Sequence, residues 1–259
     1  MNNNLTFHQR IHNAAGSQAV ENCHARHSYY HAKAFSAEEW TQIWSQSKHA
    51  TWGHFFGRMR GFDSVWFNSV GTYDARTYIN YLTLYRKFRE IIGKDPRPIN
   101  EASVHCLVND VIEVAEDGMS ARSAYVTPGV IFSNINENEK RWCNFMWERY
   151  GSDYVFEDGN WLYLHEQVCP DIMAEFDDRN WANKAFCQEL NPPEHMGPPH
   201  HRGGDGPGFD TSTELQDPGP LHFDYSATRP VQDTVPYPRP YKTMDNDNTY
   251  AQFIDTNEA

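Results

Sequence analysis

Two Glu-Asp-Gly turns constrain the fold of this chain more than any other feature of its sequence. The turns are Glu116-Asp117-Gly118 and Glu157-Asp158-Gly159, and each separates two runs in which apolar and polar residues alternate. An Asp-Gly pair between alternating runs is a strong signal for a β-hairpin. The sequence therefore predicts an antiparallel meander whose strands cover residues 104–115, 120–132, 141–156 and 161–168.

The residues before these strands have helical patterns. No Pro or Gly interrupts residues 17–35, and Ser17 is a candidate cap for this first helix. Ser36 and Glu39 have the spacing of a capping box, which marks the start of a second helix. A third helix is expected over residues 73–92. Helices followed by an antiparallel meander predict the α+β class.

The composition changes after about residue 190. Residues 191–240 hold eleven of the fifteen prolines, which excludes regular helix or sheet over most of this stretch. We therefore expect a domain over residues 1–190 and an irregular, extended Pro-rich C-terminal arm over residues 191–259. The arm carries many aromatic residues, which favours an ordered segment wrapped on its own domain or on a neighbouring subunit over a solvated tail.

Charge and cysteine usage exclude several classes of protein. The formal net charge is −13 at pH 7 and no cluster of Lys and Arg occurs, so we expect no nucleic-acid partner. No apolar run approaches the roughly 18 residues that span a bilayer, so we expect no membrane partner. The five cysteines lack CxxC spacing, and the first residues do not resemble a signal peptide. These features favour a cytoplasmic protein with reduced thiols.

Histidines occupy the face of the first helix that should be buried. With 100° between successive residues, His24, His27 and His31 fall in the same arc as Val20 and Tyr30. Burying such polar groups costs about 1–3 kcal/mol each unless they find partners. They are expected to belong to a satisfied polar core, a ligand pocket or a metal site. His24 and His31 lie about 10.5 Å apart along the axis, so we assign no metal site.

Alternation in the strands adds further polar side chains to the predicted interior. His105 and Asn109 share one face of their strand, and Tyr125 lies on a face of the next. Strict alternation also places His165 on one face with Tyr163. If the sheet curls around the first helix, these faces meet it. The residues expected to converge are Tyr30, His31, His105, Tyr125 and His165.

Three segments resemble the SnoaL-like domain of the nuclear transport factor two-like superfamily. The first, 104–118 followed by Ala121-Arg122, resembles its central hairpin; the second, 147–161, resembles its last hairpin. The third, 52–61, resembles the segment after its second helix. The resemblance covers about residues 17–186. It implies a cone-shaped, curved antiparallel sheet packed on N-terminal helices, with a pocket between sheet and first helix.

The resemblance also implies candidate activities. Scytalone dehydratase and bile acid 7-alpha-dehydratase belong to the superfamily and place a Tyr on the first helix and a His on the strand after it, which Tyr30 and His105 match. The bile acid enzyme has a further Asp, whose place falls here near Phe35 or Ser36, so that carboxylate is missing. Such enzymes use no cofactor, and family members commonly form dimers or trimers, so we expect a homo-oligomer.

Together these features predict a cofactor-independent lyase (dehydratase) or isomerase acting on a small cyclic, partly apolar substrate such as a steroid, polyketide or phenolic. His105 would be the general base, and Tyr30 would donate a proton with help from His31 or His165. The expected substrate-binding residues are His27, Trp52, Phe56, Asn109 and Tyr125. A non-catalytic ligand-binding or assembly module is the alternative. A metal-dependent enzyme using the helix histidines is the third.

Overall fold

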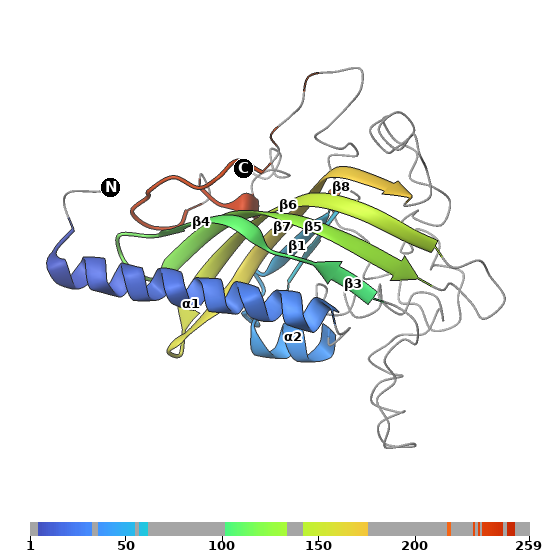
Figure 1. Ribbon diagram of the computed structural model, residues 1–259. Helices are drawn as coiled ribbons and strands as arrows, with labels where there is room; N and C mark the ends of the chain where they lie inside the picture. The colour runs from blue at the N-terminus through green and yellow to red at the C-terminus, as the bar shows by residue number, and fades with distance from the viewer. Residues whose placement is uncertain are drawn as a thin grey trace, which may run out of the picture.

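A long helix packs along one face of a curved sheet in the computed structural model (Figure 1). The structure describes residues 5–32, 36–54, 57–61, 102–133, 142–175, 217–218, 230, 233, 235–245 and 248–251. The elements are α1 (Phe7–Ala32), α2 (Ser36–Gln42), β1 (Thr51–His54), β2 (Gly57–Arg60), β3 (Ala102–His105), β4 (Val108–Val114), β5 (Ser120–Ser133), β6 (Trp142–Glu157), β7 (Asn160–Glu175) and β8 (Asp217–Pro218). The predicted α+β layout is confirmed. The third predicted helix, 73–92, lies outside the described residues.

The first helix begins earlier than its sequence pattern predicts. The backbone N–H of Gln9 donates to Oγ1 of Thr6 at 3.3 Å, and the backbone N–H of Thr6 donates to Oε1 of Gln9 at 2.9 Å. This reciprocal pair is a capping box, and it starts α1 at Phe7. Ser17, the predicted cap, lies inside the helix, where its hydroxyl donates to the carbonyl of Asn13 at 3.0 Å.

The sheet has the strand order β3-β5-β6-β7-β1-β2-β8, and β4 also pairs with β5. Both predicted hairpins are present: β4 leads to β5, and β6 leads to β7. Gly118 and Gly159 take positive φ values of 71° and 82°, which a glycine adopts without strain. The sheet is mixed, and not antiparallel throughout as predicted, because β1 pairs with β7 in parallel. The predicted strand 104–115 divides into β3 and β4.

The main core lies between α1, α2 and the sheet face that they cover. Its fully buried members include Val20 of α1, Trp44 after α2, and Tyr154 and Tyr163 of the sheet. A Cβ at Gly16 would come within 3.1 Å of the Trp161 ring, so the glycine lets α1 approach the sheet closely. The polar side chains described below lie on this same face.

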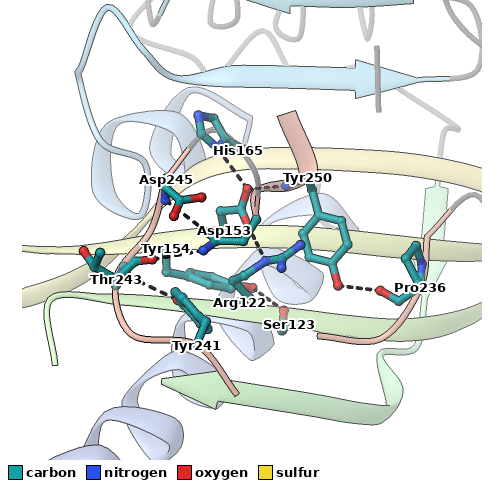
Figure 2. A network of polar contacts seen from close by, with 12 residues as sticks. Arg122, Ser123, Asp153, Tyr154, His165, Pro236, Tyr241, Thr243, Asp245 and Tyr250 are labelled. Atoms are coloured by element: carbon teal, nitrogen blue, oxygen red, sulfur yellow. Dashed lines mark hydrogen bonds and ion pairs between the residues drawn. The ribbon is translucent and has the colours of Figure 1, made fainter. Parts of the chain in front are cut away.

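The opposite face of the sheet is covered in part by the C-terminal segment 235–251. Asp153 of β6 is fully buried there, and its Oδ2 accepts the backbone N–H of Tyr250 at 2.7 Å (Figure 2). The guanidinium of Arg122 lies 3.2 Å from Oδ1 of Asp153 and stacks over the ring of Tyr250. Tyr250 lies over Gly151, where a Cβ would clash with the ring. The described part of this segment therefore packs on the domain that carries it. The domain boundary at residue 190 remains a prediction.

Candidate functional site

The face of α1 that packs on the sheet carries buried histidines. His24 and His27 are 2% and 5% exposed and lie beside the buried side chains of Val20 and Cys23. The prediction that these histidines lie on the buried face of the first helix is therefore confirmed for His24 and His27. The side chain of His31, the third member, lies outside the described residues.

His27 forms an ion pair with Glu39 of α2. The two atoms, Nδ1 of His27 and Oε1 of Glu39, lie 2.6 Å apart, and Glu39 is 2% exposed. The capping-box spacing marks the start of α2 correctly, but the Glu39 carboxylate pairs with α1 instead of capping its own helix. A buried carboxylate is costly without a charged partner, so the pair fixes α2 against α1.

His105 lies at the end of β3, beside Gly129 of β5, and is 4% exposed. Its Nδ1 lies 3.2 Å from Oε2 of Glu148 of β6, and the hydroxyl of Tyr150 donates to the same oxygen at 3.1 Å. A Cβ at Gly129 would lie 2.5 Å from the Val104 carbonyl oxygen and 3.0 Å from Nδ1 of His105, so glycine at this position lets β3 and the imidazole approach closely. Ser28 of α1 donates to the His105 carbonyl at 2.6 Å, which fixes the helix to this strand.

Glu166 of β7 is a further buried carboxylate and is 2% exposed. Its Oε1 accepts the Tyr125 hydroxyl at 3.3 Å, and its Oε2 accepts the Trp52 indole N–H at 3.1 Å. Both donors are neutral. Trp52 and Tyr125 were both predicted to contact substrate, and the structure brings them together at Glu166.

Aromatic rings join these groups into one cluster. The ring centroid of Tyr150 lies 5.2 Å from that of Tyr125, 6.0 Å from that of His27 and 6.5 Å from that of His105. The ring of His24 packs edge-on against Tyr125. The polar cluster is defined here as His27, Glu39, His105, Tyr125, Glu148, Tyr150 and Glu166.

The buried charges shift one another's titration. Burial lowers the pKa of His27, but the nearby carboxylates, Glu39 foremost, outweigh it and raise that pKa to about 9. Burial raises the pKa of Glu166 to about 7, against the opposing effect of His27. Burial and the neighbouring His27 lower the pKa of His24 well below its ordinary value. At neutral pH His27 is therefore an imidazolium, His24 is neutral, and Glu166 is partly protonated.

A β-bulge decides which side chains of β7 join the cluster. Tyr154 of β6 pairs with Tyr163, whereas Asp153 pairs with His165, so the register shifts between these two pairs. The prediction that His165 shares a face with Tyr163 is therefore wrong, because strict alternation fails at a bulge. The shift puts Glu166 on the cluster's face.

His165 belongs to the opposite face, beneath the C-terminal segment. Its Nδ1 lies 2.9 Å from Oδ2 of Asp153 (Figure 2). Its Nε2 lies 3.1 Å from the carbonyl oxygen of His49. Both ring nitrogens thus face oxygen acceptors away from His105. Its position makes it a structural histidine of the sheet.

The remaining predicted residues lie apart from the cluster or outside the described residues. The hydroxyl of Tyr30 donates to Oε1 of Gln42 at 2.6 Å, which turns it toward α2. Asn109 is exposed and takes a φ of 56° at an irregularity of β4, so it does not share the buried position of His105. Phe56 lies outside the described residues.

The sequence patterns missed the three carboxylates, Glu39, Glu148 and Glu166. Glu148 had a usable signal, because it alternates with Met146 and Tyr150 on the buried face of β6. A carboxylate at an inward position of an apolar strand indicates a partner or a function. Glu166 had no such signal, since the bulge reverses the face that alternation predicts.

The described part of the chain holds no group of three or more His, Cys, Asp or Glu side chains placed to share a metal ion. None of the helices in the described ranges is long and apolar enough to cross a membrane.

Comparison with known proteins gives similarity to solved structures alone. No family model and no curated protein matches the sequence. A candidate scytalone dehydratase from Novosphingobium aromaticivorans is 16% identical, with 66% of this chain and 93% of that chain covered and a TM-score of 0.43. A nuclear transport factor 2-like superfamily protein from Salmonella enterica is 15% identical, with coverages of 61% and 92% and a TM-score of 0.44. Hexachlorocyclohexane dehydrochlorinase LinA-type3 from Novosphingobium barchaimii is 14% identical, with coverages of 73% and 100% and a TM-score of 0.42.

One of these structures carries the name of the superfamily that the sequence resembles. We take no reaction or substrate from them, because a shared fold leaves the chemistry of a site open.

Proposed function

We propose that this protein is a lyase or isomerase that needs only proton transfer by its own side chains, and that it acts on a cyclic, partly apolar ketone. The observation that carries the proposal is the pairing of His105 with Glu148 on the face of the sheet that α1 covers, with 3.2 Å between Nδ1 and Oε2. A carboxylate at Nδ1 favours the tautomer with its proton there and the lone pair on Nε2.

His105 is the general base in this proposal. It removes a proton from a carbon next to the substrate carbonyl, and Glu148 stabilises the imidazolium that forms. Tyr150 donates to Glu148 and holds the carboxylate in place. A positioned acid–base group of this kind typically contributes 10²–10⁴-fold to a rate.

The surroundings of the pair suit an apolar ring system. Tyr125 and Tyr150 pack with Val168, and Trp52 and Leu107 lie against them. Aromatic and aliphatic side chains with a few polar groups among them are typical of small-molecule sites. This composition supports a cyclic, partly apolar substrate.

Glu148 also supports the proposal by its chemistry. The resemblance to the bile acid enzyme leaves a carboxylate missing near Phe35 or Ser36, and the buried carboxylate beside His105 comes instead from β6. We propose that Glu148 supplies the charge that the imidazolium requires.

The experiment is deuterium exchange in D₂O. A panel of steroid, polyketide and phenolic ketones is incubated with the full-length protein, and the incorporation of deuterium next to the carbonyl is followed by mass spectrometry. His105→Asn should lose about 10²–10⁴-fold of the exchange rate, and Glu148→Gln should lose a smaller factor. His8→Asn, an exposed histidine of α1, is the control. Full exchange by His105→Asn refutes the proposal.

The alternative is a non-catalytic ligand-binding module. The mutual pairing of buried groups in the cluster, such as His27 with Glu39, favours a stable polar core as well as a site. If the protein is a binding module, compounds of the panel should bind in calorimetry. The wild-type protein should then catalyse neither deuterium exchange nor product formation.

A further inference from the structure

The proposed base requires an acid when the substrate loses a hydroxyl group. Hydroxide is a poor leaving group, so the departing oxygen must be protonated as its bond to carbon breaks. Tyr30 was expected to supply this proton, but its hydroxyl is bonded to Gln42 toward α2. The proton must therefore come from another side chain on the sheet face that carries His105.

Tyr125, whose hydroxyl is hydrogen-bonded to Glu166, is a proton donor on the same face of the sheet as His105. Tyr125 comes from β5 and Glu166 from β7, and both lie on the cluster's face of the sheet. The ring centroid of Tyr150 lies 5.2 Å from that of Tyr125 and 6.5 Å from that of His105. The proposed base and the proposed acid are thus both neighbours of the Tyr150 ring.

The charges of the cluster distinguish Glu166 from the other two carboxylates. Glu39 has the imidazole of His27 within 2.6 Å, and Glu148 has that of His105 at 3.2 Å. Glu166 is bonded by the neutral groups of Tyr125 and Trp52, and burial raises its pKa to about 7. Glu166 therefore carries a proton readily near neutral pH.

A protonated Glu166 reverses the direction of its bond to Tyr125. The carboxyl O–H then donates to the phenol oxygen, and the phenol O–H is directed to another acceptor. The Trp52 indole N–H continues to donate to the other carboxyl oxygen. Tyr125 is kept neutral because burial raises its pKa well above the ordinary value.

We propose that Tyr125 is the catalytic acid of the elimination and that Glu166 is the positioning residue that returns the proton to it. This inference rests on the proposed function. His105 takes the proton from the carbon next to the carbonyl, and the released electron pair forms the carbon–carbon double bond. The bond from carbon to oxygen breaks, the oxygen takes the Tyr125 proton and leaves as water, and Glu166 protonates Tyr125. The proton on His105 then returns to Glu166 through solvent, which completes the cycle.

The test separates removal of the carbon-bound proton from departure of the oxygen. The probes are a bicyclic β-hydroxy ketone and its β-acetoxy derivative, whose acetate leaves without protonation; formation of the enone is followed by ultraviolet absorbance. Tyr125→Phe and Glu166→Gln should lose at least 100-fold with the hydroxy ketone, and less than tenfold both with the acetoxy ketone and in deuterium exchange. Tyr154→Phe, which removes another buried hydroxyl from the same face, is the matched control.

The pH dependence of kcat/KM tests whether Glu166 supplies a proton or has a structural role alone. The kcat/KM of the wild-type protein for the hydroxy ketone should fall as pH rises through about 7, and Glu166→Gln should lack that decline. Equal losses with both probes, or unchanged elimination by both variants, overturn the inference. If exchange still depends on His105 in that case, the proposed function stands and the acid lies elsewhere.

Discussion

The ion pair between His27 and Glu39 predicts an unusual dependence of stability on pH. The pKa of His27 is raised from 6.5 to about 9 in the folded protein. A raised pKa means that the folded state holds the proton more tightly than the unfolded state does. The stabilisation is therefore fully present below pH 6.5 and is lost as pH rises through 9. Its full size is about 3 kcal/mol, of which about 2 kcal/mol disappears between pH 7 and pH 9.

The assay is urea unfolding of the full-length protein, followed by circular dichroism, at half-unit steps from pH 7 to pH 9. The free energy of unfolding of the wild-type protein is compared with that of His27→Gln, so that the titrations of groups that do not interact with His27 cancel. The difference between them should shrink by about 2 kcal/mol over this range.

His24→Gln is the matched control, since His24 is buried on the same face of α1 but is already neutral at pH 7. Its difference from the wild-type protein should stay constant. Parallel curves for wild type and His27→Gln from pH 7 to pH 9 would refute the reasoning, because they would mean that His27 folds without its proton.

Three further changes test how the fold supports the site. Gly129→Ala puts a methyl group 2.5 Å from the Val104 carbonyl oxygen and 3.0 Å from Nδ1 of His105, so it should destabilise the protein by about 1–3 kcal/mol in urea unfolding.

 The exchange rate of Gly129→Ala should fall at least tenfold, while that of the surface variant His8→Asn stays at the wild-type level. Tyr250→Ala removes a fully buried ring that packs on Gly151, so it should lower the free energy of unfolding by about 3–5 kcal/mol. Tyr250→Phe loses only the hydrogen bond from its hydroxyl to the Pro236 carbonyl, so it should lower the free energy of unfolding by about 1 kcal/mol. Thr6→Ala removes the cap of α1 and should cost about 1 kcal/mol in the same unfolding assay.

Local signals predicted much of the fold correctly. The Asp-Gly pairs that end at Gly118 and Gly159 specify both hairpins, because turns of this kind depend on the few residues that form them. The stripe of α1 predicted that His24 and His27 are buried, since helical periodicity fixes which residues share a face. These features lie within single elements, so the amino-acid sequence alone determines them.

The start of α1 was equally local but was misread. Thr6 and Gln9 form a capping box whose spacing is visible in the sequence, and Gly16 is tolerated inside the helix because it lets α1 approach Trp161. The reason for that glycine lies on the sheet, far away in the chain. The predicted helix began at residue 17, directly after this glycine, whereas the packing on Trp161 lets the helix continue through it.

The partners of the buried histidines were decided only by the tertiary structure. Glu39 and Glu148 meet His27 and His105 across α2 and β6, and no spacing along the chain records these contacts. A single bulge turns His165 away from the cluster and Glu166 into it, because one extra residue exchanges the two faces of a strand. The sequence by itself determined that polar groups are buried here; strand register and packing determined which acids and bases face one another.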